Sequence, residues 1–329
     1  MKTIGRSGDR AIEPLKYLVP STQFFVALRS NGRLTTRYSV LGTCFLALLV
    51  FVGTSLPAHA AGQVQCAAVK SRTLGGPVKY CALLPDGYEK NKARRYPILY
   101  YLHGLGDNEQ SLVNSGGWNI VENLRQSGKI GDFLIVTPEG DTSFYINSYD
   151  GRTRYEDFFI REFIPAIETR YRVERTRASR GISGTSMGGY GALRFAFKYP
   201  EMFSVVSAHA AALMQKLPRR LIAAANEHAT EMDMNGLFGN PVNQQFWTRN
   251  TPFTLAKLNA AKLKRLKIYF DCGDQDDYGF DQGARELDAL LTKLGITHEF
   301  HIYTGGHDWR FVAKHFPESL EFQSRALKQ

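Results

Sequence analysis

The feature that most constrains the fold of this chain is the glycine-rich segment Gly-Thr-Ser-Met-Gly at residues 184–188. Its pattern, Gly-x-Ser-x-Gly, is typical of a sharp turn between a strand and a helix that holds the serine hydroxyl above a sheet. Glycines two positions before and after the serine have no Cβ atom to collide in so tight a turn. The segment predicts a strand at 178–183 and a helix at 187–198, although a glycine-rich loop before a buried helix would give the same pattern.

The rest of the chain decides between these two interpretations. From residue 95 onward, short apolar runs alternate with segments of helical periodicity, which is typical of a mostly parallel sheet wrapped by helices. The expected strands are 97–102, 133–137, 178–183, 203–208, 267–271 and 299–303, and the expected helices are 155–170, 187–198, 281–294 and 309–327. Residues 211–263 are less regular, and we expect a helical insertion there. The pattern predicts an α/β fold with a mostly parallel central sheet flanked by helices, as one domain of residues 61–329.

The first 60 residues have a different character. Arg33 and Arg37 precede an apolar run at 38–56, which ends in Pro-Ala-His-Ala at 57–60. A basic segment, an apolar segment and an Ala-x-Ala site are the three parts of a secretory signal peptide, so we expect cleavage after Ala60 and a secreted or periplasmic protein. A membrane anchor is the alternative, but glycine, threonine and serine residues leave its strongly apolar part short for a span. We therefore expect membrane contact only through an uncleaved leader.

The formal net charge of +10 could suggest a nucleic-acid partner, but its distribution argues against one. Residues 1–60 hold seven Lys or Arg and two acidic residues, so half of the excess, +5, lies in the leader. The remainder is spread without a basic block and without the alternation of aromatic and basic residues that binds single strands. The sequence therefore predicts no nucleic-acid partner.

Three cysteines remain after residue 60, and export would place them in an oxidising compartment. Cys66 and Cys81 lie in two β-like runs, 64–70 and 78–84, around a turn rich in glycine and proline. A hairpin would bring the two roughly opposite each other, so a disulfide is expected there. Cys272 is expected to be the odd cysteine, buried at a strand end. The chain has no Cys-x-x-Cys pair, so the cysteines predict neither a zinc site nor a redox site.

A serine hydroxyl becomes a good nucleophile only when a base takes its proton. Substrates of open α/β sheets bind beyond the carboxyl ends of the strands, so we expect the site among the loops that follow them, including 273–280 and 304–308. Of the eight histidines, His307 is the best candidate base, because it follows the last expected strand in a glycine-rich turn. His103 is expected to be a turn histidine beside the site.

The base in turn needs a carboxylate to orient it and offset its charge. Asp274, Asp276 and Asp277 follow the penultimate expected strand; we favour Asp276, and the choice among the three stays open. Such an acidic cluster could instead bind a cation, but a calcium loop starting at Asp274 would have Tyr278 and Arg285 at ligand positions. We therefore expect no metal and no cofactor.

The order Ser186, Asp276, His307 is that of nucleophile, acid and base in α/β hydrolases. The oxyanion hole should consist of two backbone N–H groups, one from Met187 and one from Leu105, after the His-Gly pair. Four side chains are candidates to line a substrate pocket, although the aromatic ones could equally be core residues: His103, Trp118, Tyr145 and Trp309.

From about residue 78 to its end, the chain resembles the α/β-hydrolase fold. More narrowly, it resembles the esterase family that contains feruloyl esterases, S-formylglutathione hydrolases and mycolyltransferase-like acyltransferases. The matching segments are Tyr-Leu-His-Gly-Leu-Gly at 101–106, Gly-Thr-Ser-Met-Gly-Gly at 184–189, Cys-Gly-Asp-Gln-Asp at 272–276 and Gly-Gly-His-Asp-Trp at 305–309. The resemblance implies the triad Ser186, Asp276 and His307, with Leu105 and Met187 in the oxyanion hole. It does not fix the substrate.

These features together lead to the hypothesis of a secreted serine carboxylesterase that works through an acyl-enzyme. Acyl or feruloyl esters of plant polysaccharide would be its substrates. Acyl transfer to a sugar or lipid hydroxyl is an alternative that uses the same residues. An inactive hydrolase fold that binds glycan is a further alternative, against which the ordered triad argues. S-formylglutathione is disfavoured as a substrate, because it is made in the cytoplasm and the leader predicts export.

Overall fold

The structure is a computed structural model that describes residues 62–217 and 234–327. The leader at 1–60 lies outside these residues, as does part of the expected insertion at 211–263, so both stay predictions. Within the described ranges, no helix has the length and apolar character needed to cross a membrane.

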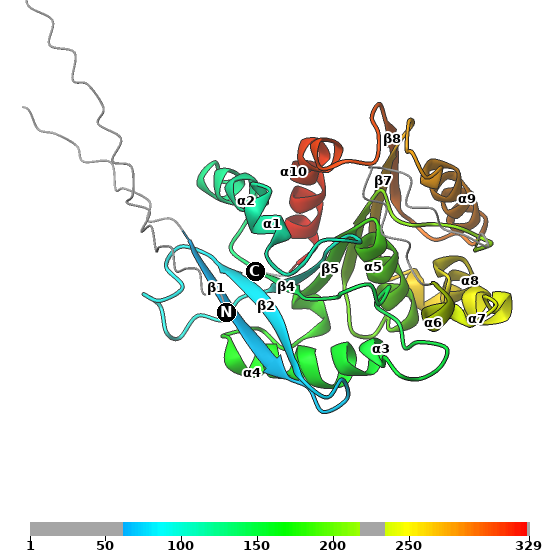
Figure 1. Ribbon diagram of the computed structural model, residues 1–329. Coiled ribbons are helices and arrows are strands. Elements are labelled where there is room, and N and C mark those ends of the chain that lie inside the picture. The colour runs from blue at the N-terminus through cyan, green and yellow to red at the C-terminus, as the bar shows by residue number, and fades with distance from the viewer. Residues whose placement is uncertain (1–61, 218–233, 328–329) are drawn as a thin grey trace, which may run out of the picture. The chain divides into compact units, whose positions relative to one another are not determined.

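The described chain forms one eight-stranded sheet in the order β1-β2-β4-β3-β5-β6-β7-β8 (Figure 1). β2 runs antiparallel to β1 and β4, and every other neighbouring pair is parallel. The mostly parallel order confirms the predicted α/β fold. The strands are β1 (Gln63–Lys70), β2 (Pro77–Leu84), β3 (Ile98–Leu102), β4 (Leu134–Pro138), β5 (Arg180–Thr185), β6 (Val205–His209), β7 (Lys267–Gly273) and β8 (Glu299–Tyr303).

Helices cover both faces of the sheet, with α2 and α10 on one side and α3, α4 and α5 on the other (Figure 1). The helices are α1 (Ser111–Asn114), α2 (Gly117–Gln126), α3 (Tyr155–Phe158), α4 (Ile164–Arg170), α5 (Met187–Lys198), α6 (Met234–Phe238), α7 (Gln244–Asn250), α8 (Pro252–Leu263), α9 (Phe280–Lys293) and α10 (Trp309–Ala326). Because successive side chains of a strand point to opposite faces, Leu99 packs in one core and Tyr100 in the other. This explains why the central strands are apolar throughout.

Two local features differ from the sequence-based expectation. The helix expected at 155–170 is interrupted by a π-helical turn, Phe159–Phe163, between α3 and α4. The helices α1 and α2 were not predicted, since the segment around Gly116 and Gly117 has the composition of a loop. Gly116 precedes α2 with a φ of 84°, a left-handed conformation that glycine adopts without steric cost.

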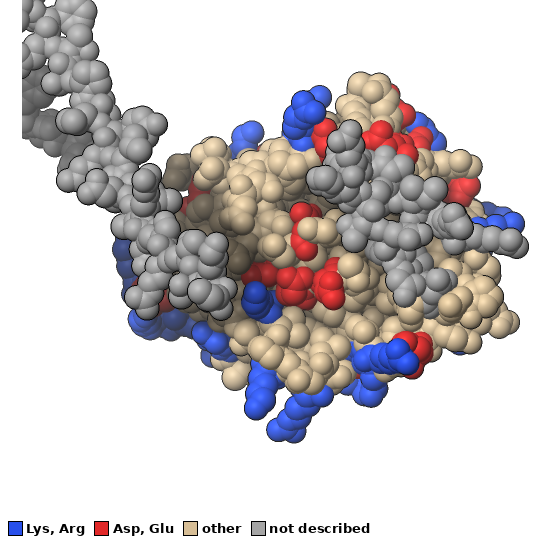
Figure 2. Space-filling model, in the orientation of Figure 1, with Lys and Arg blue, Asp and Glu red and all other residues tan. Residues whose placement is uncertain are grey.

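On the face seen in Figure 2, acidic side chains gather near the centre, and basic side chains lie mostly around the edge.

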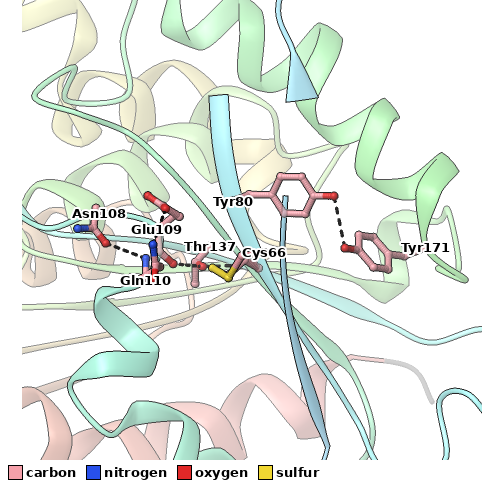
Figure 3. Close-up of a disulfide and its surroundings, with 8 residues drawn as sticks. Cys66, Tyr80, Asn108, Glu109, Gln110, Thr137 and Tyr171 are labelled. Carbon is pink, nitrogen blue, oxygen red and sulfur yellow. Dashed lines mark hydrogen bonds between the residues drawn. A yellow bond between two sulfur atoms is a disulfide. The ribbon is translucent and has the colours of Figure 1, made fainter. Parts of the chain in front are cut away.

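The hairpin of β1 and β2 places Cys66 opposite Cys81, and the structure joins them in a disulfide (Figure 3). Cys81 is also the register partner of Thr137 in β4, so the linked pair is tied to the next strand through the β2–β4 pairing. Cys272, the free cysteine of the described ranges, is buried as expected. The disulfide fastens the edge of the sheet to its interior.

We expect the double variant Cys66→Ala/Cys81→Ala to lose about 3 kcal/mol of unfolding free energy, because the bridge closes a short loop. The two cysteines are 15 residues apart. Urea titration of both proteins, with and without reductant, measures the difference. Reductant should shift the wild-type midpoint and leave the variant unchanged; equal midpoints in all four titrations would contradict a stabilising bridge.

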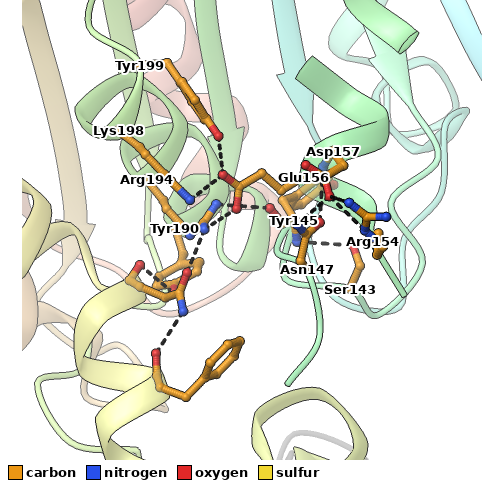
Figure 4. A network of polar contacts seen from close by, with 12 residues as sticks. Ser143, Tyr145, Asn147, Arg154, Glu156, Asp157, Tyr190, Arg194, Lys198 and Tyr199 are labelled. Atoms are coloured by element: carbon orange, nitrogen blue, oxygen red, sulfur yellow. Dashed lines mark hydrogen bonds and ion pairs between the residues drawn. The ribbon is translucent and has the colours of Figure 1, made fainter. Parts of the chain in front are cut away.

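A buried ion pair holds three helices together beneath the sheet (Figure 4). Arg194 of α5 donates to Glu156 of α3 at 2.5 Å and to the side-chain oxygen of Asn250 of α7 at 2.7 Å. Lys198 lies 2.5 Å from the other carboxylate oxygen of Glu156, and Tyr199 donates to the same carboxylate. Since Arg194 and Glu156 are almost fully buried, each charge depends on the other.

Burial raises the pKa of Glu156, but Arg194 and Lys198 outweigh it and lower the pKa to about 2. A carboxylate whose pKa is lower in the folded state than in the unfolded state stabilises the fold at pH values above its pKa in the unfolded state. This stabilisation is lost as the pH falls toward the pKa in the folded state. We expect Glu156→Gln to cost about 3–5 kcal/mol at neutral pH, because it leaves Arg194 unpaired. Urea titrations should show the gap to wild type narrowing below about pH 4.5; a gap independent of pH would contradict this account.

Candidate active site

Ser186 lies at the turn between β5 and α5, where the predicted strand, turn and helix are confirmed. Its φ is 55° and its ψ is −116°, a conformation that non-glycine residues rarely adopt. A Cβ atom on Gly188 would lie 2.0 Å from the carbonyl oxygen of Leu102, and one on Gly184 would lie 2.4 Å from the backbone of Gly188. The two glycines are therefore required for the turn.

Three side chains from separate loops at the carboxyl end of the sheet meet here. His307 follows β8, and its Nε2 lies 2.8 Å from the Oγ of Ser186. Its Nδ1 lies 2.7 Å from Oδ2 of Asp276, which follows β7. A Cβ atom on Gly273 would lie 2.2 Å from the carbonyl oxygen of Gly305, so glycine allows the two loops to touch. Two consecutive hydrogen bonds thus join the hydroxyl, the imidazole and the carboxylate.

The structure distinguishes among the three candidate carboxylates. Asp276 is 8% exposed, and its other oxygen accepts the amides of Tyr278 and Phe280 at 3.0 and 3.3 Å. Burial raises the pKa of Asp276, but the hydrogen bond and charge of His307, together with these amides, lower it overall. Asp274 instead accepts the amide of Gly305, and Asp277 is exposed. Of the three, only Asp276 contacts His307 among the described residues.

The two candidate oxyanion donors lie beside Ser186. Met187 is the first residue of α5, where backbone N–H groups have no partner within the helix. Leu105 follows Gly104, and a Cβ atom on Gly104 would lie 3.6 Å from Cβ of Ser186. Within the part of the chain that the structure describes, neither amide donates to a protein acceptor. Both N–H groups are therefore free to bind an anion.

The structure corrects two of the four expected pocket residues. His103 is 2% exposed, with Nδ1 2.8 Å from the carbonyl oxygen of Gly104 and Nε2 2.8 Å from the amide of Gly140. Tyr145 is fully buried, and its hydroxyl donates to the carbonyl oxygen of His103 at 3.0 Å. Neither offers a surface to a substrate. Both instead support the loop that carries Leu105.

The two tryptophans are placed differently. Trp118 lies on α2 with the guanidinium of Arg125 5.8 Å from its ring, and its described contacts do not include the triad. Trp309 begins α10, two residues after His307, and donates its indole N–H to the carbonyl oxygen of Ser115 at 2.6 Å. Trp309 therefore lies close to the loop that carries His307, whereas Trp118 lies on α2 without a described contact to the triad.

The rings of Tyr278 and Phe280 were missed by the sequence analysis. They meet the ring of His307 edge to face, with centroids 4.7 and 5.4 Å away. The signal was present, since both residues follow the acid within four positions. They pack one side of the imidazole and limit its rotation. Among the described residues, no group of three or more His, Cys, Asp or Glu side chains is placed to hold a metal ion.

A nucleophilic turn with an aligned imidazole and carboxylate is the arrangement of a serine hydrolase. The model of the esterase family described as "Putative esterase" matches residues 71–322. The chain therefore belongs to this esterase family, whose solved relatives share its α/β-hydrolase fold.

Curated relatives and solved structures agree with this assignment. An esterase of Mycobacterium tuberculosis is 28% identical over 244 residues, covering 69% of this chain and 52% of the relative, so the chain spans about half of that protein's length. The acetyl esterase of Caldicellulosiruptor saccharolyticus is 30% identical over 235 residues, covering 69% of this chain and 83% of the relative. The structure of a ferulic acid esterase superposes with a TM-score of 0.70 at 27% identity, covering 81% of this chain and 99% of that one.

Proposed function

We propose that this protein hydrolyses carboxylic esters through an acyl-enzyme formed on Ser186. The observation that carries the proposal is the continuous line of hydrogen bonds from Ser186 through His307 to Asp276, at 2.8 and 2.7 Å. Nε2 of His307 takes the hydroxyl proton while Oγ attacks the ester carbonyl carbon. The amides of Met187 and Leu105 donate to the oxyanion that forms, and each such donor is worth about 3 kcal/mol in the transition state.

The second half of the reaction uses the same groups. The alcohol leaves with the proton that His307 holds, and the acyl group stays on Ser186. Water then gives a proton to His307 and attacks the acyl carbon. His307 passes this proton to Oγ as the bond between Oγ and the acyl carbon breaks, which releases the acid and restores the serine. Asp276 accepts from Nδ1 throughout and stabilises the imidazolium.

We further propose that the substrates are small acyl esters, with acetyl and feruloyl groups as the first candidates. The proposal is supported by the likeness to an acetyl esterase at 30% identity and to a ferulic acid esterase at 27%. An esterase of Anaeromyces mucronatus solved with ferulic acid shares the fold at 19% identity and a TM-score of 0.59. We also propose export, on the basis of the leader sequence; the amino terminus of the exported protein should be residue 61.

A panel of acetyl, butyryl and feruloyl esters tests the activity. With an activated ester, we expect a rapid release of alcohol equal to the enzyme concentration, followed by slower turnover, because acylation by such an ester is faster than deacylation and the acyl-enzyme accumulates. Trehalose or another polyol in the same assay distinguishes water from a hydroxyl as the acyl acceptor. A folded protein that neither turns over nor releases alcohol with any ester of the panel would contradict the proposal.

A further inference from the structure

A second serine, histidine and carboxylate lie in line beneath the candidate site. Nδ1 of His209 lies 2.8 Å from Oδ2 of Asp271, and its Nε2 lies 2.8 Å from Oγ of Ser319. These distances match those of Ser186, His307 and Asp276. All three inner residues are at most 1% exposed, so no substrate reaches them. The inner group is therefore not a second active site. Its role depends on the strands and the helix that its hydrogen bonds connect.

The inner group joins two strands and a helix. His209 ends β6 and is the register partner of Asp271 in β7, while Ser319 belongs to α10. The hydroxyl of Tyr269 donates to Oδ2 of Asp271 at 3.0 Å, so the carboxylate has a partner from its own strand as well. A buried polar pair of this kind costs desolvation energy, which its hydrogen bonds must offset. It fixes the ends of β6 and β7 relative to each other.

The backbone of the same pair holds the peptide groups of Ser186. The amide of Ser186 donates to the carbonyl oxygen of His209 at 2.9 Å, and the amide of Ala212 donates to the carbonyl oxygen of Ser186 at 3.0 Å. Between these two contacts, the amide of Ala210 donates to the carbonyl oxygen of Asp271 at 2.9 Å. The strained conformation of Ser186 is thus held from both sides by the segment that begins at His209.

The pair also lies on the strand that leads to the candidate acid. Asp271 precedes Cys272, whose thiol donates to Oδ2 of Asp276 at 3.5 Å. Burial raises the pKa of the Cys272 thiol, so it stays a protonated donor. One buried pair therefore sets the relative positions of the backbone segments that carry the nucleophile and the acid.

We propose that His209 and Asp271 are positioning residues for the reaction at Ser186, beyond any contribution to folding. This inference rests on the proposed function, because it concerns the reactivity of Ser186. A misplacement of about 1 Å at a reacting atom can cost about 100-fold in rate. For the variant His209→Leu/Asp271→Leu, we expect a kcat and a fluorophosphonate labelling rate about 10- to 100-fold below wild type, with KM changed by less than about 3-fold.

The double variant replaces a buried polar pair by apolar side chains, a change that proteins often tolerate without loss of stability. His209→Gln is the conservative companion, since its amide keeps one hydrogen bond, and it should recover part of the lost rate. Glu168→Gln is the matched control: it breaks the buried ion pair with Arg180, at 2.7 and 2.9 Å, at the opposite end of β5. It should lower the unfolding midpoint and leave kcat per folded molecule unchanged.

Rates are compared per folded molecule, with the folded fraction taken from thermal unfolding. Wild-type kcat and labelling rate in the folded double variant would overturn the positioning role. If the double variant does not fold, a wild-type kcat and labelling rate in His209→Ala, which keeps neither hydrogen bond of the imidazole, would overturn it. If the proposed esterase function is itself wrong, the wild-type protein will not react with the fluorophosphonate at all. This result differs from a wild-type labelling rate in the variants, so the two outcomes can be distinguished.

Discussion

Replacing Ser186 by alanine is expected to lower kcat for an activated ester by at least about 10⁴-fold, because the variant lacks the hydroxyl that would form the acyl-enzyme. KM should change little, since the hydroxyl contributes to the transition state more than to ground-state binding. Initial rates and the early release of alcohol measure both effects, and the release should disappear.

Ser183→Ala is the matched control for this variant. Ser183 lies three residues earlier in β5, and its buried hydroxyl accepts from Ser207 at 2.8 Å. Its loss should cost about 1 kcal/mol of stability and leave kcat unchanged. Substantial turnover by purified Ser186→Ala would mean that the chemistry occurs elsewhere.

Replacing Asp276 by asparagine is expected to lower kcat by about 10⁴-fold, because an amide holds the imidazole in the wrong tautomer and cannot offset its charge. Asp277→Asn and Asp274→Asn should each change kcat by less than about 3-fold, since neither side chain contacts His307. The kcat values of the three variants, together with their unfolding midpoints, separate the acid from its neighbours. A large loss of activity with Asp277→Asn and none with Asp276→Asn would contradict the observed geometry.

The candidate triad could be predicted because each member has a local signal at a strand end. The Gly-x-Ser-x-Gly pattern around Ser186 is typical of the strand-turn-helix that the structure shows, and His307 follows a pair of glycines after the last strand. The choice of Asp276 over Asp277 could not be settled, because adjacent residues differ only in the direction of their side chains. That direction depends on the amides of Tyr278 and Phe280, which the fold brings to Asp276.

The wrong expectations from the sequence concern contacts between residues that are distant along the chain. A local sequence pattern does not indicate such contacts. Tyr145 was expected near a substrate, but glycines at 140 and 191 let its ring pack where any Cβ atom would come within 2.6 Å. The pairing of β6 with β7 places the imidazole of His209 beside the carboxylate of Asp271, a contact that the sequence around His209 does not indicate. The short helices α1 and α2 were missed, since glycine and serine around residue 116 favour a loop in isolation.

Covalent labelling with a fluorophosphonate, followed by mass spectrometry of the digested protein, tests the central claim most directly. The account predicts one adduct per folded molecule, on the peptide that carries Ser186. It also predicts labelling slower by at least about 10³-fold in His307→Ala, because the hydroxyl then has no base. An unlabelled Ser186 in protein that still hydrolyses esters, or an adduct formed equally fast without His307, would contradict it.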